Sequence, residues 1–505
     1  MSSIQKLKYF TNGEWKESKT NKYMPVTDSS TGKIIAETPC CTEDEVNEAI
    51  ESAKAAFPQW AGIPITERVQ IMYKFKTLIQ QNLDELAKLI ATEQGKAMRE
   101  ARGEVLSTIG DIEYAIGSPW LVHGDFAMNV SRGHDITLMR EPIGVFAGVS
   151  PSNFPSMIPF GWMLPLCITL GNTFVLKAAS LVPLTGVRMI ELLQEAGLPK
   201  GVVNFLTCSR KEAEIVLKHP DIKGVSYVGS TKVGMHIYST AASHGKRVQA
   251  LCEAKNHALV LKDCELELTA HRIVTSAFGA AGQRCMALPV VCVEEEIADE
   301  LVQHMIGFAK ELKLGPAYKD CTTLGPVISA EQKKFITDWI DKGVAEGAKL
   351  VLDGRSSVVE GFEDGYFVGP TIFDYVRPGM SVGDEEIFGP VLCVKRIKDF
   401  EEGLTIANEN KLANGSVIFT QNGYYAREFI TRTHGGMVGV NVGIPAVAPG
   451  FPFSGHKDSF FGDLHAKGKD GIAFYTQVKC VTTKWFSDED KKALNEVKTV
   501  AKCGE

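Results

Sequence analysis

The chain has 505 residues, of which 44% are hydrophobic and 23% are charged, and its formal net charge at pH 7 is −7. The composition is typical of a globular protein, and the length exceeds one hydrophobic core, so two or three domains are expected. An acidic chain without a basic stripe excludes nucleic acid as the expected partner.

The cysteines and the apolar stretches indicate the compartment. Twelve cysteines are scattered along the chain, and no C-x-x-C or cysteine–histidine pair has the spacing of metal ligands. We therefore expect no metal site and a reduced, cytoplasmic protein. The N-terminus lacks the apolar stretch and cleavage site of a signal peptide. Residues 143–176 carry no charge, but their prolines interrupt the stretch too often for a membrane span.

In chain order, the first expected elements are amphipathic helices. Residues 43–60 and 67–95 have helical periodicity, and we expect them to cover one face of the first domain. A strand is expected at 134–142, within a hairpin at about 120–142. This strand and a second one at 472–486 stand outside the alternations described below, which suits pairing between subunits.

From residue 143, short apolar runs alternate with longer amphipathic ones. Such an alternation predicts βαβ units and a parallel sheet. The expected strands are 143–149, 173–177, 202–206 and 224–229, and the expected helices are 156–170, 184–197 and 211–219.

A second alternation begins at residue 257, so a second α/β domain is expected, with the seam near residues 250–256. The tail from Ser487 is rich in Lys, Asp and Glu and is expected to be solvated or loosely held. The second domain has an expected helix at 268–282 and expected strands at 257–261, 289–293, 369–376, 389–397, 415–420 and 436–442.

Cys285 lies between an expected helix and an expected strand, where a side chain can reach a cleft. The small residues at 279–282 let other groups approach it closely, and the charge of Arg284 favours its thiolate. These features suit a nucleophile, although a lone cysteine is also a common packing residue.

Asn153 lies in the turn between the strand 143–149 and the helix 156–170. If its amide points into the cleft, it can donate a hydrogen bond to the oxyanion that forms when a thiolate attacks a carbonyl. A helix N-cap is the alternative role for this residue.

Gly229 and Ser230 end another strand and precede a helix, whose first backbone N–H groups can bind a dinucleotide pyrophosphate. Lys177 ends a neighbouring strand, at the edge of the sheet where ligands of such folds bind. A full G-x-G-x-x-G pattern is absent, so an ordinary turn with a serine cap and a solvated lysine are the alternatives.

Glu386 and Phe388 occur in the stretch G-D-E-E-I-F-G-P, before a turn set by Gly389 and Pro390. Glu386 can bind a pair of ribose hydroxyls, and Phe388 can lie against a flat ring. A surface glutamate and a core phenylalanine are the alternatives.

Taken together, these motifs resemble the aldehyde dehydrogenase superfamily. The resemblance rests on their order along nearly the whole chain: S-N-F-P, G-N-T-F-V-L-K, V-G-S-T, G-Q-R-C, E-I-F-G-P and G-V-N-V. Within the superfamily, the stretches G-Q-R-C-M-A, A-K-N-H-A-L-V-L, 437–479 and T-T-K-W-F are similar to the branch of methylmalonate-semialdehyde dehydrogenases, which transfer the acyl group to coenzyme A.

The resemblance implies an α/β aldehyde dehydrogenase-like fold. We expect a Rossmann-type parallel-sheet NAD-binding domain at 1–252, an α/β catalytic domain at 253–450 and a C-terminal return at 451–505 that carries a strand for oligomerisation. With the hairpin at about 120–142, that strand would form a small β element. A homodimer or homotetramer is implied.

The resemblance also implies the roles of the site residues. Cys285 would attack the aldehyde, Asn153 and the Cys285 backbone N–H would hold the oxyanion, and a hydride would pass to NAD. Arg284 would contact the substrate. Coenzyme A would be the co-substrate, and no metal would take part. The implied cofactor-binding residues are Ser150, Ser152, Lys177, Ser180, Leu181, Gly229, Ser230, Cys252, Glu386 and Phe388.

One difference from the family concerns the release of the acyl group. In hydrolytic relatives, the glutamate that opens an E-L-G-G-K motif activates water. This chain reads L-C-E-A-K, so Leu251 stands at that position, as expected for a branch that uses coenzyme A. Glu253 lies two residues further. Strand alternation would place it on the same face as Leu251, where it could act as a displaced base.

A second difference concerns the cofactor. The family stretch K-P-S-E-R becomes K-A-A-S-L, so Ser180 replaces a glutamate that would hold the adenosine ribose, and Leu181 replaces an arginine. Loss of the carboxylate removes its repulsion of a 2′-phosphate, so NADP use becomes possible beside NAD.

A third difference concerns the substrate. Ser107 stands where the branch has an arginine thought to hold the substrate carboxylate, and Arg284, with Arg102 or Arg99, would have to compensate. One extra residue between Phe154 and Gly171 is expected to reshape the substrate tunnel.

Our leading hypothesis is therefore an NAD-dependent, acylating oxidation of a short semialdehyde, such as malonate or methylmalonate semialdehyde. The alternative is a hydrolytic dehydrogenase, with Glu253 as base, or one for another small anionic aldehyde. A third reading is a noncatalytic nucleotide-binding protein that has kept the fold.

Overall fold

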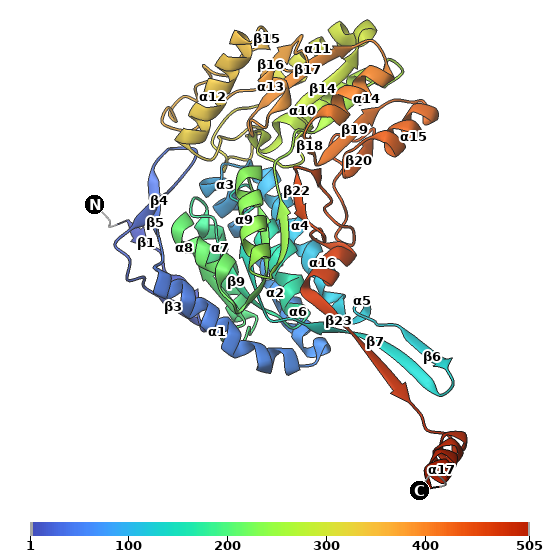
Figure 1. The fold of residues 1–505 in the computed structure, drawn as a ribbon. Coiled ribbons are helices and arrows are strands. Elements are labelled where there is room, and N and C mark those ends of the chain that lie inside the picture. The colour runs from blue at the N-terminus through green and yellow to red at the C-terminus, as the bar shows by residue number, and fades with distance from the viewer. Residues whose placement is uncertain (1–3, 503–505) are drawn as a thin grey trace.

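The computed structural model describes residues 4–502. It contains two large sheets, each covered by helices, and a slender arm that projects from the first of them (Figure 1). Both large sheets are mainly parallel, as expected for the two α/β domains. Among the helices of residues 4–502, none combines the length and apolar character of a membrane-spanning segment.

The first sheet has eight strands in the order β22-β12-β11-β8-β9-β10-β2-β3. Its five central strands are parallel, and most of their residues are buried, as expected for a sheet covered on both faces. The bounds are β2 Tyr9–Thr11, β3 Glu14–Lys16, β8 Val145–Val149, β9 Thr173–Lys177, β10 Val203–Leu206, β11 Ile222–Val228, β12 Arg247–Leu251 and β22 Phe460–Gly462.

The order of the central strands sets the place of a ligand. The chain runs outward from β8 through β9 to β10, and then returns to the other side of β8 with β11 and β12. The direction of winding therefore reverses between β8 and β11, and in such sheets ligands bind outside the carboxyl ends of the strands at this point. These ends are Val149 and Val228.

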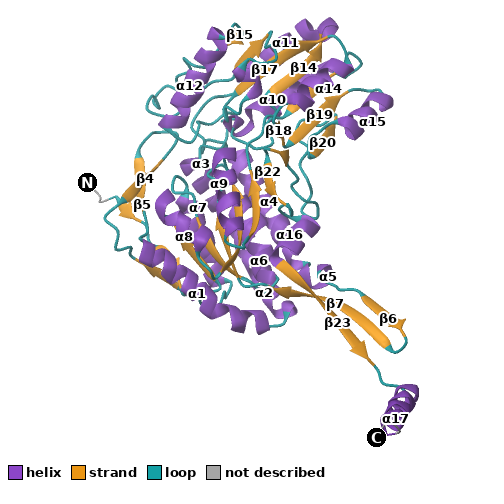
Figure 2. Ribbon diagram, in the orientation of Figure 1, coloured by secondary structure: helices purple, strands orange, loops and turns teal. Residues whose placement is uncertain are grey.

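Helices cover the first sheet on both faces (Figure 2). The helix α1 begins with a capping box, in which Thr42 and Glu45 each bind the other's backbone N–H. The helices are α1 Glu43–Gly62, α2 Ile65–Gln81, α3 Leu83–Glu93, α4 Met98–Ile116, α5 Ser118–Leu121, α6 Leu164–Thr169, α7 Pro183–Glu195, α8 Arg210–Lys218 and α9 Thr231–Ser243.

The second sheet has seven strands, parallel except for the edge strand β15, in the order β15-β16-β17-β14-β13-β19-β20. Its strands are β13 His257–Val260, β14 Val290–Glu294, β15 Lys349–Leu352, β16 Thr371–Asp374, β17 Val391–Ile397, β19 Gly415–Phe419 and β20 Met437–Val440. Its helices are α10 Leu266–Phe278, α11 Glu295–Lys310, α12 Ala330–Ala345, α13 Ser381–Asp384, α14 Phe400–Glu409 and α15 Gly423–Arg432.

The strands predicted outside both alternations pair with each other. Strand β23 (Thr476–Lys484) lies antiparallel to β7 (His134–Pro142), which also pairs with β6 (Phe126–Ser131). Together they form the arm, and β6 and β23 are its free edges within the chain. Apolar side chains on the arm are exposed, among them Phe126, Met128, Val130, Met139 and Val478.

The structure changes two of the predicted elements and gives the C-terminal tail a secondary structure. The strand predicted at 472–486 begins only at Thr476, because residues before it belong to helix α16 (Gly468–Tyr475). The tail from Ser487 is solvated as expected, since nearly all of residues 487–498 are exposed, and it forms helix α17 (Asp488–Lys502). The helix predicted at 156–170 is divided into a π-helix, η1 (Ile158–Met163), and α6.

The remaining elements are small. One three-stranded sheet has the order β1-β5-β4, and a two-stranded pair joins β18 to β21. Their bounds are β1 Gln5–Lys6, β4 Tyr23–Thr27, β5 Ile34–Pro39, β18 Leu412–Ala413 and β21 His456–Lys457, and a 3-10 turn, η2, spans Gly279–Gly282.

Candidate active site

A cavity of about 530 Å³ has Cys285 in its wall. Helix α4, the loop after β8, the Cys285 turn and the loop after β20 surround it, so parts of both large sheets contribute. The side chain of Cys285 is half-buried. The lining includes Glu100, Ser107, Asp111, Phe154, Met157, Trp162, Arg284, Met286, Ile444, Val447, Phe453 and Lys467.

A tight turn delivers Cys285 to this cavity. After α10 ends at Phe278, Ala280 and Ala281 have φ values of 50° and 51°, and Gly282 has a φ of 72°. Non-glycine residues rarely adopt this conformation, and such strain is concentrated at functional sites. A Cβ at Gly282 would lie 2.1 Å from the carbonyl oxygen of Gly389, so the glycine is needed where the two loops meet.

Two asparagines fix the backbone of the nucleophile candidate. The side-chain amides of Asn256 and Asn414 donate to the Cys285 carbonyl oxygen at 2.9 and 3.0 Å. Asn256 follows the seam between the two sheets, and Asn414 precedes β19. The carbonyl of Cys285 is therefore held from two directions, which limits movement of its sulfur.

Asn153 lies next to the Cys285 turn, in the loop between β8 and η1. Its amide nitrogen Nδ2 donates to the Gln283 carbonyl at 3.1 Å, and its own carbonyl accepts from the Lys96 ammonium at 2.8 Å. The N-cap alternative is wrong, because the N-cap residue of η1 is Met157. Asn153 therefore contacts Gln283, which precedes Cys285 by two positions in the chain. A donor to an oxyanion formed at Cys285 would be needed in this region.

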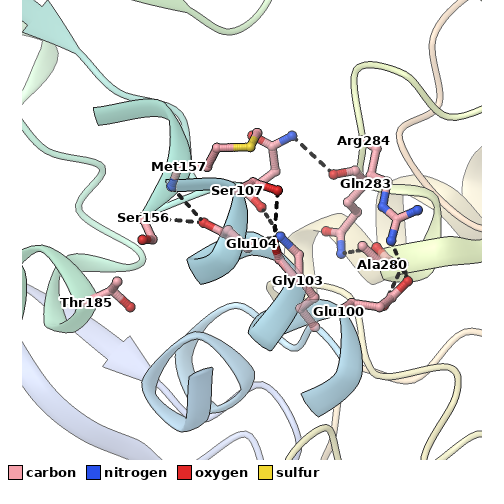
Figure 3. Close-up of polar contacts among 12 residues, drawn as sticks. Glu100, Gly103, Glu104, Ser107, Ser156, Met157, Thr185, Ala280, Gln283 and Arg284 are labelled. Carbon is pink, nitrogen blue, oxygen red and sulfur yellow. Dashed lines mark hydrogen bonds and ion pairs between the residues drawn. The ribbon is translucent and has the colours of Figure 1, made fainter. Parts of the chain in front are cut away.

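A buried ion pair between Lys96 and Glu104 holds the loop that contains Asn153. The Lys96 ammonium lies 2.6 Å from Glu104, and both side chains are almost wholly excluded from solvent. The second oxygen of Glu104 accepts from the backbone N–H groups of Ser156 and Met157 (Figure 3). One carboxylate on α4 therefore holds both the lysine under Asn153 and the backbone beyond it.

The charge of Arg284 favours the Cys285 thiolate, as the sequence suggested, but burial has the larger effect. Arg284 forms an ion pair with Glu100 of α4, which also accepts from the Ala280 backbone N–H (Figure 3). Burial, reinforced by the charge of Glu386, raises the pKa of Cys285 to about 12, although Arg284 opposes the rise. Cys285 is a neutral thiol at neutral pH, because burial outweighs the charge of its neighbour.

A second cavity, of about 550 Å³, lies at the point between β8 and β11 where the winding of the first sheet reverses. The predicted cofactor residues Ser150, Ser152, Lys177, Ser180 and Leu181 all line it. Burial lowers the pKa of Lys177, and the charges of nearby cysteines oppose this. Among residues 4–502 the Lys177 ammonium has no ion-pair or hydrogen-bond partner, so it is available to a ligand.

The turn with Gly229 and Ser230 precedes helix α9 beside this cavity. Ser230 is the N-cap residue, but its side chain makes no capping hydrogen bond, so the alternative of an ordinary serine cap is wrong. Tyr227, which lines the cavity, donates to the Ser230 carbonyl at 3.1 Å. The N–H groups of the first turn of α9 are free of a side-chain cap, as an anion site requires.

Five predicted cofactor residues lie outside the lining of this cavity: Gly229 and Ser230, described above, and Cys252, Glu386 and Phe388. Glu386 accepts from the Ala254 backbone N–H at 2.9 Å, and burial raises its pKa to about 8. Phe388 has a φ of 55° and borders the narrow space between Glu386 and Arg284. Cys252 is buried against Gly234 of α9, where a Cβ would lie 2.2 Å from its sulfur.

Comparison with known proteins identifies the family. The sequence model of the aldehyde dehydrogenase family matches residues 15–481. The chain belongs to the aldehyde dehydrogenase family. This is the family that the sequence motifs indicated, and the match covers the second large sheet, the first one except β2 and the start of β3, and most of the arm.

Individual relatives of this aldehyde dehydrogenase are similar over almost their whole length. The malonate-semialdehyde dehydrogenase of Bacillus cereus is 46% identical over 96% of this chain and 99% of its own. The crystal structure of methylmalonate-semialdehyde dehydrogenase from Oceanimonas doudoroffii superposes with a TM-score of 0.94 at 38% identity, covering 96% of this chain and 99% of that one. A structure from Sinorhizobium meliloti 1021, assigned to the same enzyme and complexed with NAD, has a TM-score of 0.94 at 37% identity, with the same coverage.

The geometry of this aldehyde dehydrogenase revises the reading of Glu253. Strand β12 ends at Leu251, so strand alternation does not place Glu253 on the same face. Leu251 is 3% exposed, and the backbone N–H of Glu253 donates to Thr231 at the start of α9. Neither residue lines the Cys285 cavity.

The positions of the residues predicted to shape the substrate pocket agree only in part with the sequence analysis. Ser107 lines the Cys285 cavity, but its hydroxyl donates to the Gly103 carbonyl in its own helix. Arg102 points instead to Asp84 and Asp320. Phe160 and Gly161, where the sequence was expected to carry one extra residue, lie in the π-helix η1, whose turn is wider than that of an α-helix.

Sequence reasoning missed several residues that shape this site, namely Lys96, Glu100, Glu104, Asp111 and Lys467. The motif G-E-V contains Glu104, but it gave no sign that the carboxylate is buried. No group of three metal-ligating side chains that could hold a metal ion occurs within the described part of the chain.

Proposed function

We propose that this aldehyde dehydrogenase oxidises a short-chain semialdehyde, malonate or methylmalonate semialdehyde, with NAD, and transfers the acyl group from Cys285 to coenzyme A. The observation that carries the proposal is the approach of Asn153 to the turn of Cys285: Asn153 Nδ2 lies 3.1 Å from the Gln283 carbonyl, and Cys285 lines the cavity. The relatives named malonate- and methylmalonate-semialdehyde dehydrogenase support the choice of substrate.

In the first step the sulfur of Cys285 bonds to the aldehyde carbon as the thiol gives up its proton. The carbonyl oxygen becomes negative, and the Asn153 amide, which turns from the Gln283 carbonyl, donates to it together with the Cys285 backbone N–H. Because burial raises the pKa of Cys285, the thiol stays protonated until substrate and cofactor change its surroundings.

NAD supplies the acceptor for the hydride that leaves the substrate carbon. The residues at the second cavity fit such a dinucleotide: the uncapped N-terminus of α9 suits a pyrophosphate, and the enclosed Lys177 suits a ribose. Ser180 and Arg210 line the same cavity without a carboxylate at the Ser180 position, so NADP is an acceptable second cofactor.

In the second step a thioester on Cys285 is opened by the thiol of coenzyme A. The new sulfur–carbon bond forms as the bond to Cys285 breaks, and Cys285 leaves as a thiolate that takes up a proton. The buried, apolar Leu251 stands where hydrolytic relatives carry their base, and this supports acyl transfer over hydrolysis. A thiol needs less activation than water, because it ionises more readily.

The setting of the enzyme follows from the arm and the cysteines. The free edge strands of the arm, β6 and β23, and its exposed apolar side chains support assembly into a homodimer or homotetramer by strand pairing. The cysteines of the described residues are all free, which supports a reducing, cytoplasmic location.

Steady-state kinetics test the proposal. With malonate semialdehyde and NAD, NADH formation is expected to depend on coenzyme A, and malonyl-CoA is expected as product. NADH formation indifferent to coenzyme A, with free malonate as product, contradicts acyl transfer and supports a hydrolytic enzyme.

A further inference from the structure

The wall of the Cys285 cavity carries a second cation besides Arg284. The Lys467 side chain is 8% exposed, lines the cavity and lies 2.9 Å from Asp111 of α4, which is itself 5% exposed. Trp162 of the π-helix η1 completes the group, with its ring 5.3 Å from the Lys467 ammonium. This cluster joins α4, η1 and the residue before α16.

Lys467 occupies its position against two local costs. Its backbone has a φ of 71° and a ψ of 177°, a region that is essentially reserved for glycine. It is also the N-cap residue of α16, where the positive end of the helix dipole repels a cation. Neither cost is offset by packing alone, because a glycine in this position would avoid both. Costs of this kind persist where a residue has a function.

Arg284 and Lys467 differ in how many of their N–H donors remain free to bind a ligand. Arg284 is tied to Glu100, and a Cβ at Gly279 would lie 2.4 Å from its guanidinium, so the group is packed in place. The Lys467 ammonium has three N–H donors, and within residues 4–502 its one polar side-chain partner is Asp111. Lys467 is therefore the cation in this wall that has donors left for a ligand.

We propose that Lys467, positioned by Asp111, binds the distal carboxylate of the aldehyde substrate and so selects an anionic aldehyde. This inference rests on the proposed aldehyde oxidation and adds to it the residue that binds the negatively charged group of the substrate. The ammonium keeps Asp111 on one side and donates to the substrate carboxylate with its remaining N–H groups.

The test compares malonate semialdehyde with propanal, which has a methyl group in place of the carboxylate. In the double variant Lys467→Gln with Asp111→Asn, which leaves no buried charge unpaired, kcat/KM for malonate semialdehyde is expected to fall about 10- to 100-fold, the value of one charge-assisted hydrogen bond. The kcat/KM for propanal should change by about twofold or less. Lys467→Arg should retain the preference.

The control is Lys469→Gln, which removes an exposed cation from the same helix and should leave both substrates unchanged. If the double variant keeps the wild-type ratio of the two kcat/KM values, the assignment of Lys467 is overturned. Lys467→Gly offers a second variant, since it relieves the backbone and removes the cation, and it is expected to lose the preference as well.

A binding measurement separates this inference from the proposed function. Malonate, but not malonamide, should protect Cys285 of the wild-type protein from iodoacetamide, and Lys467→Gly should abolish the protection. Absence of protection by malonate in the wild type overturns the inference even if aldehydes are oxidised. Protection without oxidation of either aldehyde overturns the proposed function and leaves the anion site standing.

Discussion

Replacing Glu104 by alanine tests how the loop that carries Asn153 is held. The Glu104 side chain lies 2.6 Å from the Lys96 ammonium. It also accepts from the backbone N–H groups of Ser156 and Met157 at 2.8 and 3.2 Å, and Lys96 in turn donates to the Asn153 carbonyl. The substitution therefore removes the charge partner of a buried lysine and the acceptor of two backbone hydrogen bonds.

The expected loss follows from these contacts. An uncompensated buried charge costs about 3–5 kcal/mol. Burial lowers the pKa of Lys96 while Glu104 opposes this, so the lysine can release its proton in the variant, which limits the loss. We expect the free energy of unfolding to fall by about 4 kcal/mol. We also expect kcat to fall about 10- to 100-fold, because Asn153 loses its anchor.

Urea denaturation and steady-state kinetics measure both effects. The matched control is Glu113→Ala on the same helix, whose partner Lys76 lies at the surface, and it should cost about 1 kcal/mol or less. The double variant Lys96→Met with Glu104→Leu should lose less stability than the sum of its single variants. The reasoning is refuted if Glu104→Ala is no more destabilising than Glu113→Ala and leaves kcat unchanged.

Three further predictions concern Asn153, Glu386 and Ser180. Asn153→Ala should lower kcat about 10²- to 10³-fold, as for loss of an oxyanion donor, with an unchanged NAD dissociation constant in a fluorescence titration; a loss below about tenfold argues against an oxyanion role. The pKa of Glu386 is raised from 4.5 to about 8, so its contribution to stability is fully present below 4.5 and is lost as the pH rises through 8. Glu386→Gln should therefore flatten the fall of the melting temperature between pH 5 and 9, and equal slopes contradict this. Ser180→Glu should raise KM for NADP far more than KM for NAD, whereas equal changes would place the 2′-phosphate elsewhere.

The sequence predicted the elements whose pattern is local. The strand expected at 173–177 has those bounds, and the helix expected at 211–219 is shifted by one residue, because apolar runs and capping residues decide both. The helix at 156–170 was predicted as one element, since periodicity alone does not show where a turn widens into a π-helix. Likewise, the pattern of 472–475 suited a strand, and the packing of α16 decided otherwise.

The chemistry of the site divides in the same way. Cys285 and Asn153 stand in short motifs, so their approach could be anticipated. The pairs Arg284–Glu100 and Lys467–Asp111 join residues far apart in the chain, and no local signal marks them. The sequence therefore showed that the charge of Arg284 favours the thiolate, but it did not show that Arg284 pairs with Glu100 or that desolvation raises the pKa of Cys285 by more than Arg284 lowers it.

The most direct test of the central claim is a single turnover followed by mass spectrometry. With malonate semialdehyde and NAD but no coenzyme A, we expect an acyl group on the peptide that contains Cys285, in an amount equal to the NADH formed. Added coenzyme A should remove it as malonyl-CoA. NADH formed without an acyl group on Cys285, or an acyl group on a different residue, would contradict the account.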